Sequence, residues 1–288
     1  MTDPRATSPL PESARGLTPG SFLGDVAVVT GGGTGLGLEV SRGLAALGAE
    51  VTILSRDPEH HRGLLAEAGE RGWRVFAERV DVREPKDVAR AAEAVLARSG
   101  KVDVLVNNAA GNFVCPSERL SANAWRAVLG IVLDGTFYCS RDLGRAMIER
   151  GSGRILNVVA TYAWTGMPGV AHSASAKAGV LALTKTLAAE WARHGVRVNA
   201  IAPGPFHTQG ATSNLWPDPA ARARLEAQIP LGRFGTAAEV AAHCLYLLSP
   251  ACAWMTGECL VVDGGISLAR SMWEPGERVA RRAEEGRA

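Results

Sequence analysis

The sequence of 288 residues predicts an α/β fold with a doubly wound parallel sheet in a single domain. Three observations predict it. Short β-rich runs alternate with helical stretches, a glycine-rich turn joins the first run to the first helix, and polar residues follow the ends of the runs. Strands that alternate with helices form a parallel sheet covered on both faces. Open sheets of this class reach this length without splitting into two domains.

The first strand and the turn after it predict a dinucleotide site. Residues 25–30 read as a short buried strand, and the turn of residues 31–37 leads into a helical pattern closed by Gly48. Glycines let the backbone approach a pyrophosphate, which the free N–H groups and the dipole of the helix stabilise. The sheet is therefore expected to be of the Rossmann type. The predicted cofactor contacts in the turn are Gly31, Gly33, Thr34, Gly35, Leu36 and Gly37.

The end of the second strand, residues 50–54, favours NADPH over NADH as the cofactor. An enzyme that uses NAD usually has an acidic residue here for the ribose 2′-hydroxyl, but this chain has Ser55 and Arg56. A guanidinium suits a 2′-phosphate, and the serine is a second donor. The alternative is a solvated surface arginine.

The later strands are expected over residues 74–77, 102–106, 154–159, 197–201 and 259–262. Ligands of such sheets bind at the carboxyl ends of the strands, where the strand order reverses. Polar or glycine-containing segments follow four of these strands, at residues 81–82, 107–113, 161–162 and 203–208.

Composition and the chain ends narrow the class of protein. Residues 21–270 are predicted to form an NADP-binding catalytic domain, between a flexible N-terminal arm (residues 1–20) and a polar C-terminal tail (residues 271–288). The arm lacks the apolar core of a secretion signal, and no run approaches the roughly 18 apolar residues of a membrane span. A formal net charge of +2 gives no case for nucleic acid, and five scattered cysteines predict neither disulfides nor a metal site. We therefore expect a cytoplasmic enzyme.

The ordered motifs resemble the short-chain dehydrogenase/reductase family over about residues 22–268. This resemblance implies that Asp81 and Val82 border the adenine and that Asn108 and Ala109 wall the cofactor. It also implies that residues 203–208 hold the nicotinamide amide, with Pro203, Gly204 and Phe206 as contacts.

The catalytic positions of that family are altered in this chain. Where the family usually has Asn, Ser, Tyr and Lys, the aligned residues are Asp134, Ala160, Ser173 and Lys177. A serine hydroxyl is a far weaker acid than a tyrosine, whose reference pKa is about 10. An ordinary carbonyl reductase would lack its acid, so we predict that Tyr162, fifteen positions before the retained lysine, supplies it.

Within the family, residues 107–113, 116–121, 173–180 and 203–205 resemble the NADPH-dependent 2,4-dienoyl-CoA reductases, particularly the mitochondrial type. In that subgroup the residues matching Tyr162 and Asn112 bind the thioester oxygen, and the residue matching Lys177 binds the nicotinamide ribose. The resemblance implies reduction of a dienoyl-CoA to a trans-3-enoyl-CoA, an auxiliary step of unsaturated fatty acid β-oxidation. We further expect Lys177 to lower the pKa of Tyr162, and Ser173 to leave room for the tyrosine ring.

The predicted substrate contacts rest on fewer matching residues than the predicted cofactor contacts. Arg83, Phe113 and Ser121 match substrate positions of the subgroup, whereas Asn214 stands where the subgroup has an arginine. Arg222 or Arg224 can compensate, or these are solvated surface arginines. Residues 205–235 are predicted as a substrate lid, with Trp216 and Phe234 as walls or as core. The resemblance implies an acyl-CoA partner and a homotetramer, formed through the helices that hold Asp134 and Lys177 and through residues 259–268.

Two alternatives stay open. One is an NADPH-dependent reductase of trans-2-enoyl-CoA, of another activated alkene or of a carbonyl. The other is a non-catalytic NADPH-binding sensor or scaffold. Tyr162 favours the diene enzyme over the first, and the retained Lys177 argues against the second.

Overall fold

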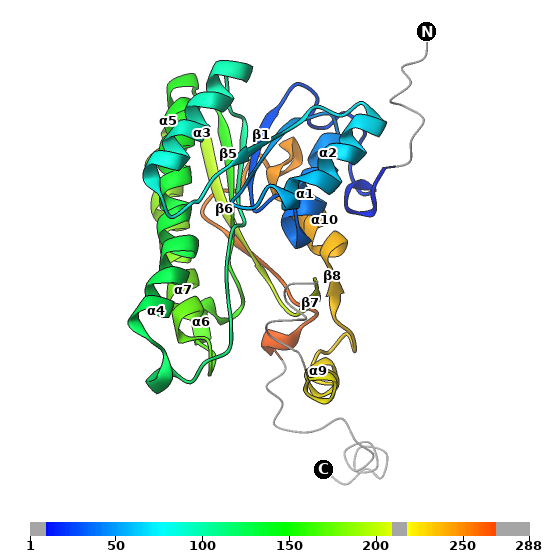
Figure 1. The fold of residues 1–288 in the computed structure, drawn as a ribbon. Coiled ribbons are helices and arrows are strands. Elements are labelled where there is room, and N and C mark those ends of the chain that lie inside the picture. The colour runs from blue at the N-terminus through cyan, green and yellow to red at the C-terminus, as the bar shows by residue number, and fades with distance from the viewer. Residues whose placement is uncertain (1–9, 209–217, 269–288) are drawn as a thin grey trace.

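A computed structural model describes residues 10–208 and 218–268, and its centre is a parallel sheet with helices on both faces (Figure 1). The seven strands lie in the order β3-β2-β1-β4-β5-β6-β9. This confirms the predicted Rossmann-type α/β fold. Expected and observed strands differ only at their ends. The strands are β1 (Val26–Thr30), β2 (Glu50–Ser55), β3 (Val75–Arg79), β4 (Val104–Asn107), β5 (Gly153–Val158), β6 (Val196–Pro203) and β9 (Cys259–Val262).

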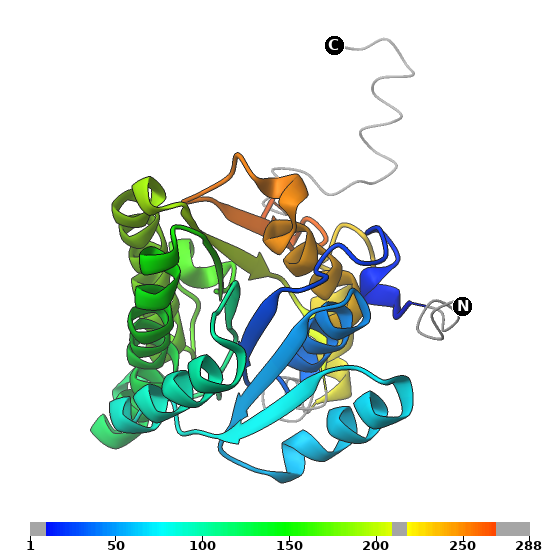
Figure 2. The same cartoon turned by 90° about the horizontal axis from the view of Figure 1, so that it is seen from above.

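Helices cover the sheet in two layers, and the view from above shows the strands running between them (Figure 2). One layer holds α1 (Gly35–Ala46), α2 (Glu59–Arg71) and α10 (Ala237–Leu248). The other holds α3 (Pro85–Ser99), α4 (Ala122–Leu129), α5 (Gly135–Arg150) and α7 (Ala171–Trp191).

In strand β1, apolar residues do not alternate with polar ones. Ala27 and Val29 belong to the apolar core under α1 and α10, while Val26 and Val28 belong to the core under α3 and α5. Successive side chains of a strand point to opposite faces, and both faces of a parallel sheet are buried. The strand is therefore apolar at nearly every position.

A π-helical turn, Gly130–Asp134, joins α4 to α5 and was not predicted from the sequence. Asp134 is exposed at the end of this turn. The next residue, Gly135, packs against the segment that follows β3, because a Cβ there would lie 2.8 Å from a side-chain carbon of Val82. The turn thus brings this helix close to the carboxyl end of the sheet.

Part of the predicted flexible arm is packed on the domain. Residues Glu12–Ala14 form a 3₁₀ turn in which Ser13 and Ala14 are buried, and Ala14 joins the core under α10. The expectation of a loose arm is therefore wrong for this turn, because its small side chains fit against α1 and α10. Residues 1–9 and the predicted tail lie outside the described residues.

The segment predicted as a lid is anchored at both ends. Strands β7 (Phe206–His207) and β8 (Gly235–Thr236) pair in parallel, and α9 (Pro219–Glu226) lies between them in the chain. Phe234 is buried, and its ring lies 5.0 Å from that of His207, so it belongs to the core. Asn214 and Trp216 lie outside the described residues.

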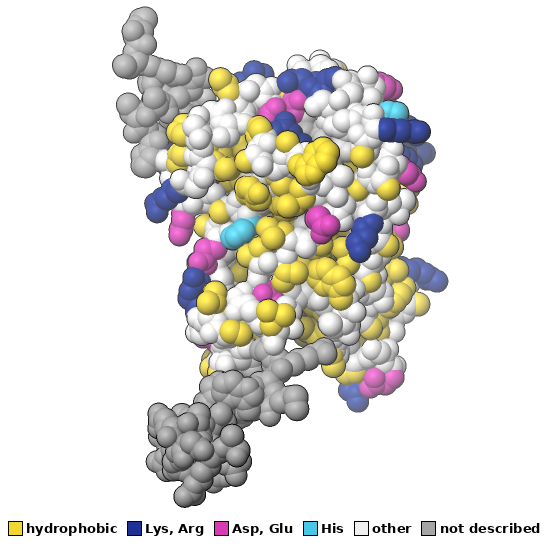
Figure 3. Space-filling view, turned by 180° about the vertical axis from the view of Figure 1, so that it is seen from behind, with side chains coloured by type: hydrophobic (Ala, Val, Ile, Leu, Met, Phe, Trp, Pro, Cys, Tyr) yellow, Lys and Arg dark blue, Asp and Glu magenta, His cyan; other side chains and the backbone are white. Residues whose placement is uncertain are grey.

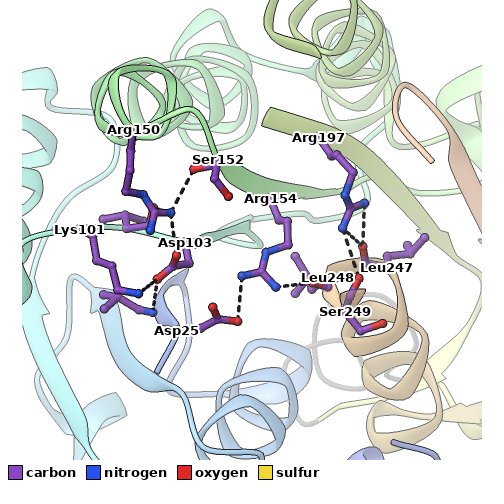
Figure 4. Close-up of polar contacts among 12 residues, drawn as sticks. Asp25, Lys101, Asp103, Arg150, Ser152, Arg154, Arg197, Leu247, Leu248 and Ser249 are labelled. Atoms are coloured by element: carbon purple, nitrogen blue, oxygen red, sulfur yellow. Dashed lines mark hydrogen bonds and ion pairs between the residues drawn. The ribbon is translucent and has the colours of Figure 1, made fainter. Parts of the chain in front are cut away.

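Ion pairs tie the amino ends of the strands together (Figure 4). Asp103, just before β4, accepts a hydrogen bond from the first N–H of β1 at 2.8 Å and lies 3.0 Å from Lys101 and 2.6 Å from Arg150. Arg154 at the start of β5 pairs with Asp25 at 2.8 Å. Because parallel strands share one direction, this network lies at the edge opposite their carboxyl ends. Among the described residues, the helices are all too short or too polar to cross a membrane.

Candidate active site

A cavity of about 780 Å³ opens beyond the carboxyl ends of the strands. It lies where the strand order reverses between β1 and β4, which is where open α/β sheets bind their ligands. The structure thus brings most of the predicted cofactor residues together. Those that line the cavity are Gly31, Thr34, Gly35, Leu36, Ser55, Arg56, Asp81, Val82, Asn108, Ala109 and Phe206.

The glycine-rich turn has the geometry that a pyrophosphate requires. Gly31 and Gly35 have φ of +63° and +52°, which residues with a side chain rarely adopt. Helix α1 starts at Gly35 and has no acidic side chain in its first turn. Its N-terminal N–H groups and dipole therefore favour an anion in the cavity. The residues present fit a dinucleotide.

Two further glycines of the turn, Gly33 and Gly37, have packing roles that the sequence did not separate from cofactor contact. A Cβ on Gly37 would lie 2.2 Å from the carbonyl oxygen of Gly31, so this glycine lets α1 pack on the turn. A Cβ on Gly33 would lie 2.0 Å from the carbonyl oxygen of His60 at the start of α2. Neither glycine lines the cavity.

Thr30 and Asn108 hold the turn to the loop after β4. The Thr30 hydroxyl accepts hydrogen bonds from the N–H groups of Asn108 and Ala109, both at 2.9 Å. The Asn108 side chain donates to the carbonyl oxygen of Thr30 at 3.0 Å. This role of Thr30 was not predicted from the sequence, where the only signal is the position of Thr30 at the end of the first strand.

A buried chain of amides and hydroxyls supports the same loop. Asn107, the last residue of β4, donates to Asn157 at 2.8 Å and to Ser140 at 2.9 Å. Asn157 donates in turn to Thr184 on α7 at 2.9 Å. These bonds fix β4, β5, α5 and α7 to one another directly beneath the site.

At the cavity end near β3, two predicted binding residues pair with each other. The Arg83 guanidinium contacts the Asp81 carboxylate at 2.5 and 3.0 Å. Hydrogen bonding from Arg83 lowers the pKa of Asp81 despite partial burial. Arg83 was predicted to contact coenzyme A, and in this structure its charge is already balanced.

Two of the predicted catalytic side chains, those of Tyr162 and Asn112, are in hydrogen-bond contact, and Ser173 joins them. The Tyr162 hydroxyl, on the short helix α6 (Tyr162–Thr165), lies 3.0 Å from the Ser173 hydroxyl on α7. It also accepts a hydrogen bond of 3.3 Å from the Asn112 side-chain amide. The side-chain oxygen Oδ1 of Asn112 accepts a hydrogen bond from the backbone N–H of Phe113 at 2.9 Å, which orients the side-chain amide. Ser173 therefore leaves room for the tyrosine, as expected, and is also its hydrogen-bond partner.

The prediction about the pKa of Tyr162 is wrong. Lys177 was expected to lower the pKa of Tyr162, but burial raises that pKa, and the bond to Ser173 offsets only part of the rise. Lys177 is 6% exposed, and its ammonium donates to the carbonyl oxygen of Val158 on β5 at 2.5 Å. Burial lowers the pKa of Lys177 to about 8. Burial is thus the main cause of both shifts, and Tyr162 stays protonated at neutral pH.

The predicted substrate residues that the structure describes, Arg83, Phe113 and Ser121, do not line the cavity. Phe113 stacks on the buried His172, with ring centroids 4.3 Å apart. Ser121 is the N-cap of α4 and accepts a hydrogen bond from the N–H of Ala124 at 3.2 Å, a role that the sequence analysis did not foresee. Arg224 on α9 is exposed, 3.9 Å from Asp218.

The last predicted cofactor contacts, Pro203 and Gly204, lie at the carboxyl end of β6. Pro203 ends the strand, and the N–H of Gly204 donates to Val262 of β9 at 2.9 Å. A Cβ on Gly204 would lie 2.6 Å from the Cα of Asp263, so the glycine allows close packing of the two segments.

Together the fold, the glycine turn and the cavity at the carboxyl ends of the strands define an oxidoreductase that binds a nicotinamide cofactor. A family model described as "Enoyl-(Acyl carrier protein) reductase" matches residues 31–267. The chain belongs to the short-chain dehydrogenase/reductase family, as the sequence motifs predicted.

Curated relatives and solved structures match nearly the whole domain. The chain is 42% identical to "Probable 2,4-dienoyl-CoA reductase [(2E)-enoyl-CoA-producing]" of Bacillus subtilis, over 83% of this chain and 94% of the relative. It is 37% identical to "Peroxisomal 2,4-dienoyl-CoA reductase [(3E)-enoyl-CoA-producing]" of Danio rerio, over 86% and 83%. A crystal structure of a short chain dehydrogenase from Bacillus anthracis is 43% identical, with a TM-score of 0.77 and coverage of 88% and 100%. A gluconate 5-dehydrogenase from Burkholderia cenocepacia in complex with NADP and tartrate is 34% identical, with a TM-score of 0.81 and coverage of 86% and 98%.

Proposed function

We propose that this protein reduces 2,4-dienoyl-CoA thioesters with NADPH. The observation that carries the proposal is the cluster in which the Tyr162 hydroxyl meets the Asn112 amide and the Ser173 hydroxyl. The names of the relatives from Bacillus subtilis and Danio rerio support the same substrate class.

NADPH is the proposed cofactor because of the end of β2. Ser55 and Arg56 line the cavity there, at the position where NAD enzymes have a carboxylate for the ribose 2′-hydroxyl. The relative solved with NADP supports this choice. When bound, NADPH supplies a hydride to the far end of the diene.

The Tyr162 cluster has the donors that an oxyanion hole needs. As the hydride adds, negative charge moves through the conjugated chain to the thioester oxygen. Asn112 donates into the phenol oxygen, so the phenol hydrogen points away from Asn112, to Ser173 or to a substrate oxygen. The raised pKa of Tyr162 keeps this hydrogen in place at neutral pH. Each such donor stabilises the transition state by roughly 3 kcal/mol.

Lys177 is the proposed anchor of the nicotinamide ribose. One N–H of its ammonium donates to Val158, and an ammonium carries three donors, so two remain for ribose hydroxyls. With its pKa at about 8, the group is mostly charged at neutral pH.

The dienolate is proposed to take up a proton from water at the carbon beside the thioester, which gives a trans-3-enoyl-CoA. Relatives named for (2E) and for (3E) products both match the chain, so the position of the product double bond is measured directly in the assay below.

A homotetramer is proposed from exposed apolar residues on the elements through which assembly is expected. Phe137 on α5 and Val261 on β9 are each 43% exposed. Hydrophobic side chains also gather on the face seen from behind (Figure 3). Light scattering of the purified protein measures the number of subunits.

The test of the function is to mix the purified protein with NADPH and trans,trans-2,4-hexadienoyl-CoA and to follow the loss of NADPH absorbance. Turnover of the diene, with trans-2-hexenoyl-CoA a much poorer substrate, is the expected result, and NMR of the product locates its double bond. Turnover of the monoenoyl thioester alone contradicts the proposal in favour of an enoyl-CoA reductase. Binding of NADPH without turnover of either thioester favours a sensor.

A further inference from the structure

We propose that His60 is a second cationic group for the 2′-phosphate of NADPH, and that its protonation sets how strongly the protein prefers NADPH to NADH. The inference rests on the proposed use of NADPH. It assigns a role in cofactor choice to α2, in addition to the residues at the end of β2.

The position of His60 is fixed by two neighbours. Its ring nitrogen Nδ1 lies 3.3 Å from the hydroxyl of Ser55 at the end of β2. Its carbonyl oxygen lies 2.0 Å from where a Cβ on Gly33 would be, so the start of α2 rests directly on the glycine turn. The side chain is 49% exposed and lines the cavity beside Ser55 and Arg56. The imidazole thus stands between the pyrophosphate turn and the expected place of the adenosine ribose.

The chemistry of this corner suits a phosphate. Arg56 and Arg79 line the same part of the cavity, and the Arg79 guanidinium donates to the carbonyl oxygen of Arg56 at 3.3 Å. A phosphate monoester carries about −1.5 to −2 charges at pH 7. A neutral imidazole offers one N–H donor, whereas an imidazolium offers two and a positive charge. Protonation of His60 therefore strengthens the site for a 2′-phosphate but does little for a 2′-hydroxyl.

The carboxylate of Asp57 also makes NADPH binding depend on the charge of His60. It lines the cavity, and one oxygen lies 4.0 Å from Nε2 of His60. An imidazolium offsets this negative charge, which otherwise repels the 2′-phosphate. Neutral His60 leaves the carboxylate uncompensated, so both effects weaken NADPH binding as pH rises.

Other charged groups around His60 are already paired or set apart. On α2, Glu59 pairs with Arg62 at 2.6 Å, and burial lowers the pKa of His61, which disfavours its charged form. At the end of β3, Asp81 pairs with Arg83. Among the described residues that line the cavity, the charged side chains left to act on the 2′-phosphate are therefore those of Arg56, Arg79, Asp57 and His60.

The experiment measures binding, not turnover. NADPH and NADH are titrated, by nicotinamide fluorescence, into the wild type, His60→Gln and Arg145→Gln at about pH 6 and about pH 8.5. Arg145→Gln is the control because it removes an exposed cation on α5, in the other layer of helices and outside the cavity lining. His60→Gln is expected to weaken NADPH binding roughly threefold to tenfold at the lower pH, as for a partly solvated charged hydrogen bond, and less than twofold at the higher pH. NADH binding and the control variant should not change. Glutamine keeps a hydrogen-bond donor at this position but has no titrating group. The 2′-phosphate ionises in the same way with either protein, so its effect cancels when His60→Gln is compared with the wild type.

Three outcomes overturn the inference. An equal loss for NADPH and NADH assigns His60 a purely structural role, a loss that is independent of pH assigns it a neutral hydrogen bond, and no loss removes it from the site. Wild type that binds NADH at least as tightly as NADPH at both pH values contradicts the proposed cofactor instead. Because no thioester is present, failure on dienoyl-CoA does not affect the result.

Discussion

Replacing Tyr162 with phenylalanine tests the proposed oxyanion hole with the smallest change, since only the hydroxyl oxygen is lost. That oxygen accepts from Asn112 at 3.3 Å and lies 3.0 Å from the Ser173 hydroxyl. If it also donates to the thioester oxygen in the transition state, its loss should lower kcat about 100-fold to 1,000-fold on 2,4-hexadienoyl-CoA. KM should change little, because a donor that acts mainly in the transition state contributes little to substrate binding.

The stability cost of this change is expected to be small enough to leave a folded protein. Ser173 is only 2% exposed, so its hydroxyl loses a partner without gaining water. An unsatisfied buried hydroxyl costs about 1–3 kcal/mol, whereas domains are stable by about 5–15 kcal/mol. Urea unfolding and NADPH binding of Tyr162→Phe verify that the site is intact before its kinetics are interpreted.

Ser173→Ala is the matched control for Tyr162→Phe. It removes the other end of the same 3.0 Å contact but leaves the phenol and its bond from Asn112. We expect kcat within about tenfold of the wild type, because the phenol remains as the donor. The reasoning is refuted if Tyr162→Phe keeps more than about a third of the wild-type kcat, or if both variants lose activity equally.

Three other changes test the packing and charge arguments. Lys177→Met should abolish turnover, yet raise the free energy of unfolding of the cofactor-free protein by about 1–2 kcal/mol in urea at pH 7. Burial of the ammonium costs about 3 kcal/mol, because it lowers the pKa of Lys177 to about 8. The variant relieves this cost but leaves the Val158 carbonyl without its donor, which cancels part of the gain. Because the unfolded lysine holds its proton to about pH 10.4 and the folded one only to about 8, wild-type stability rises between these values, and the advantage of the methionine should shrink there; a constant advantage contradicts the assignment. Asp103→Asn should cost about 2–3 kcal/mol at pH 7, since, despite burial, the bonds from Val26, Lys101 and Arg150 lower the pKa of Asp103. A carboxyl group with a lowered pKa stabilises the fold above its unfolded pKa of about 3.9, so the difference between wild type and Asp103→Asn should vanish as pH falls through the folded pKa. Glu59→Gln is the control, because it breaks an exposed ion pair and should change the free energy of unfolding by less than about 0.5 kcal/mol. Gly33→Ala should weaken NADPH binding and lower the free energy of unfolding by about 1–3 kcal/mol, because the start of α2 must move to make room for the Cβ. Gly69→Ala is the control: its Cβ meets nothing within 4 Å, so it should stabilise α2 by about 0.5–1 kcal/mol. Equal effects of the two variants in calorimetry would exclude the steric explanation.

Most of the fold was predictable because the signals are local. The buried strand, the turn and the helix that follow Asp25 are contiguous in sequence, and the alternation of strands and helices gives a parallel sheet. The partners of Arg83 and Ser121 are equally local, at Asp81 and at the N–H of Ala124, but their sequence neighbourhood alone does not reveal that these side chains are engaged. The π-helical turn before Gly135 has no comparable signal in the sequence, and the residue against which Gly135 packs, Val82, is remote in the chain.

The electrostatics of the site were the least predictable part. The sequence places a tyrosine and a lysine in one pocket but does not give the burial of either group. Burial raises the pKa of Tyr162 and lowers that of Lys177, the reverse of the expected effect of the lysine on the phenol. Opposite shifts of this kind arise from desolvation, because it penalises the charged form of both groups.

The geometry of the relocated phenol explains this outcome and fits the proposed chemistry. A tyrosine on α7 at position 173 would begin at the helix and extend its hydroxyl a full ring beyond it. Tyr162 enters from α6 instead, and its hydroxyl ends 3.0 Å from Ser173 Oγ, close to where such a ring would begin. Lys177 meanwhile directs its ammonium to the carbonyl of Val158. A phenol in this position keeps its proton, which would hinder a group that must deliver a proton to a carbonyl but suits one that must only donate a hydrogen bond to a thioester oxygen.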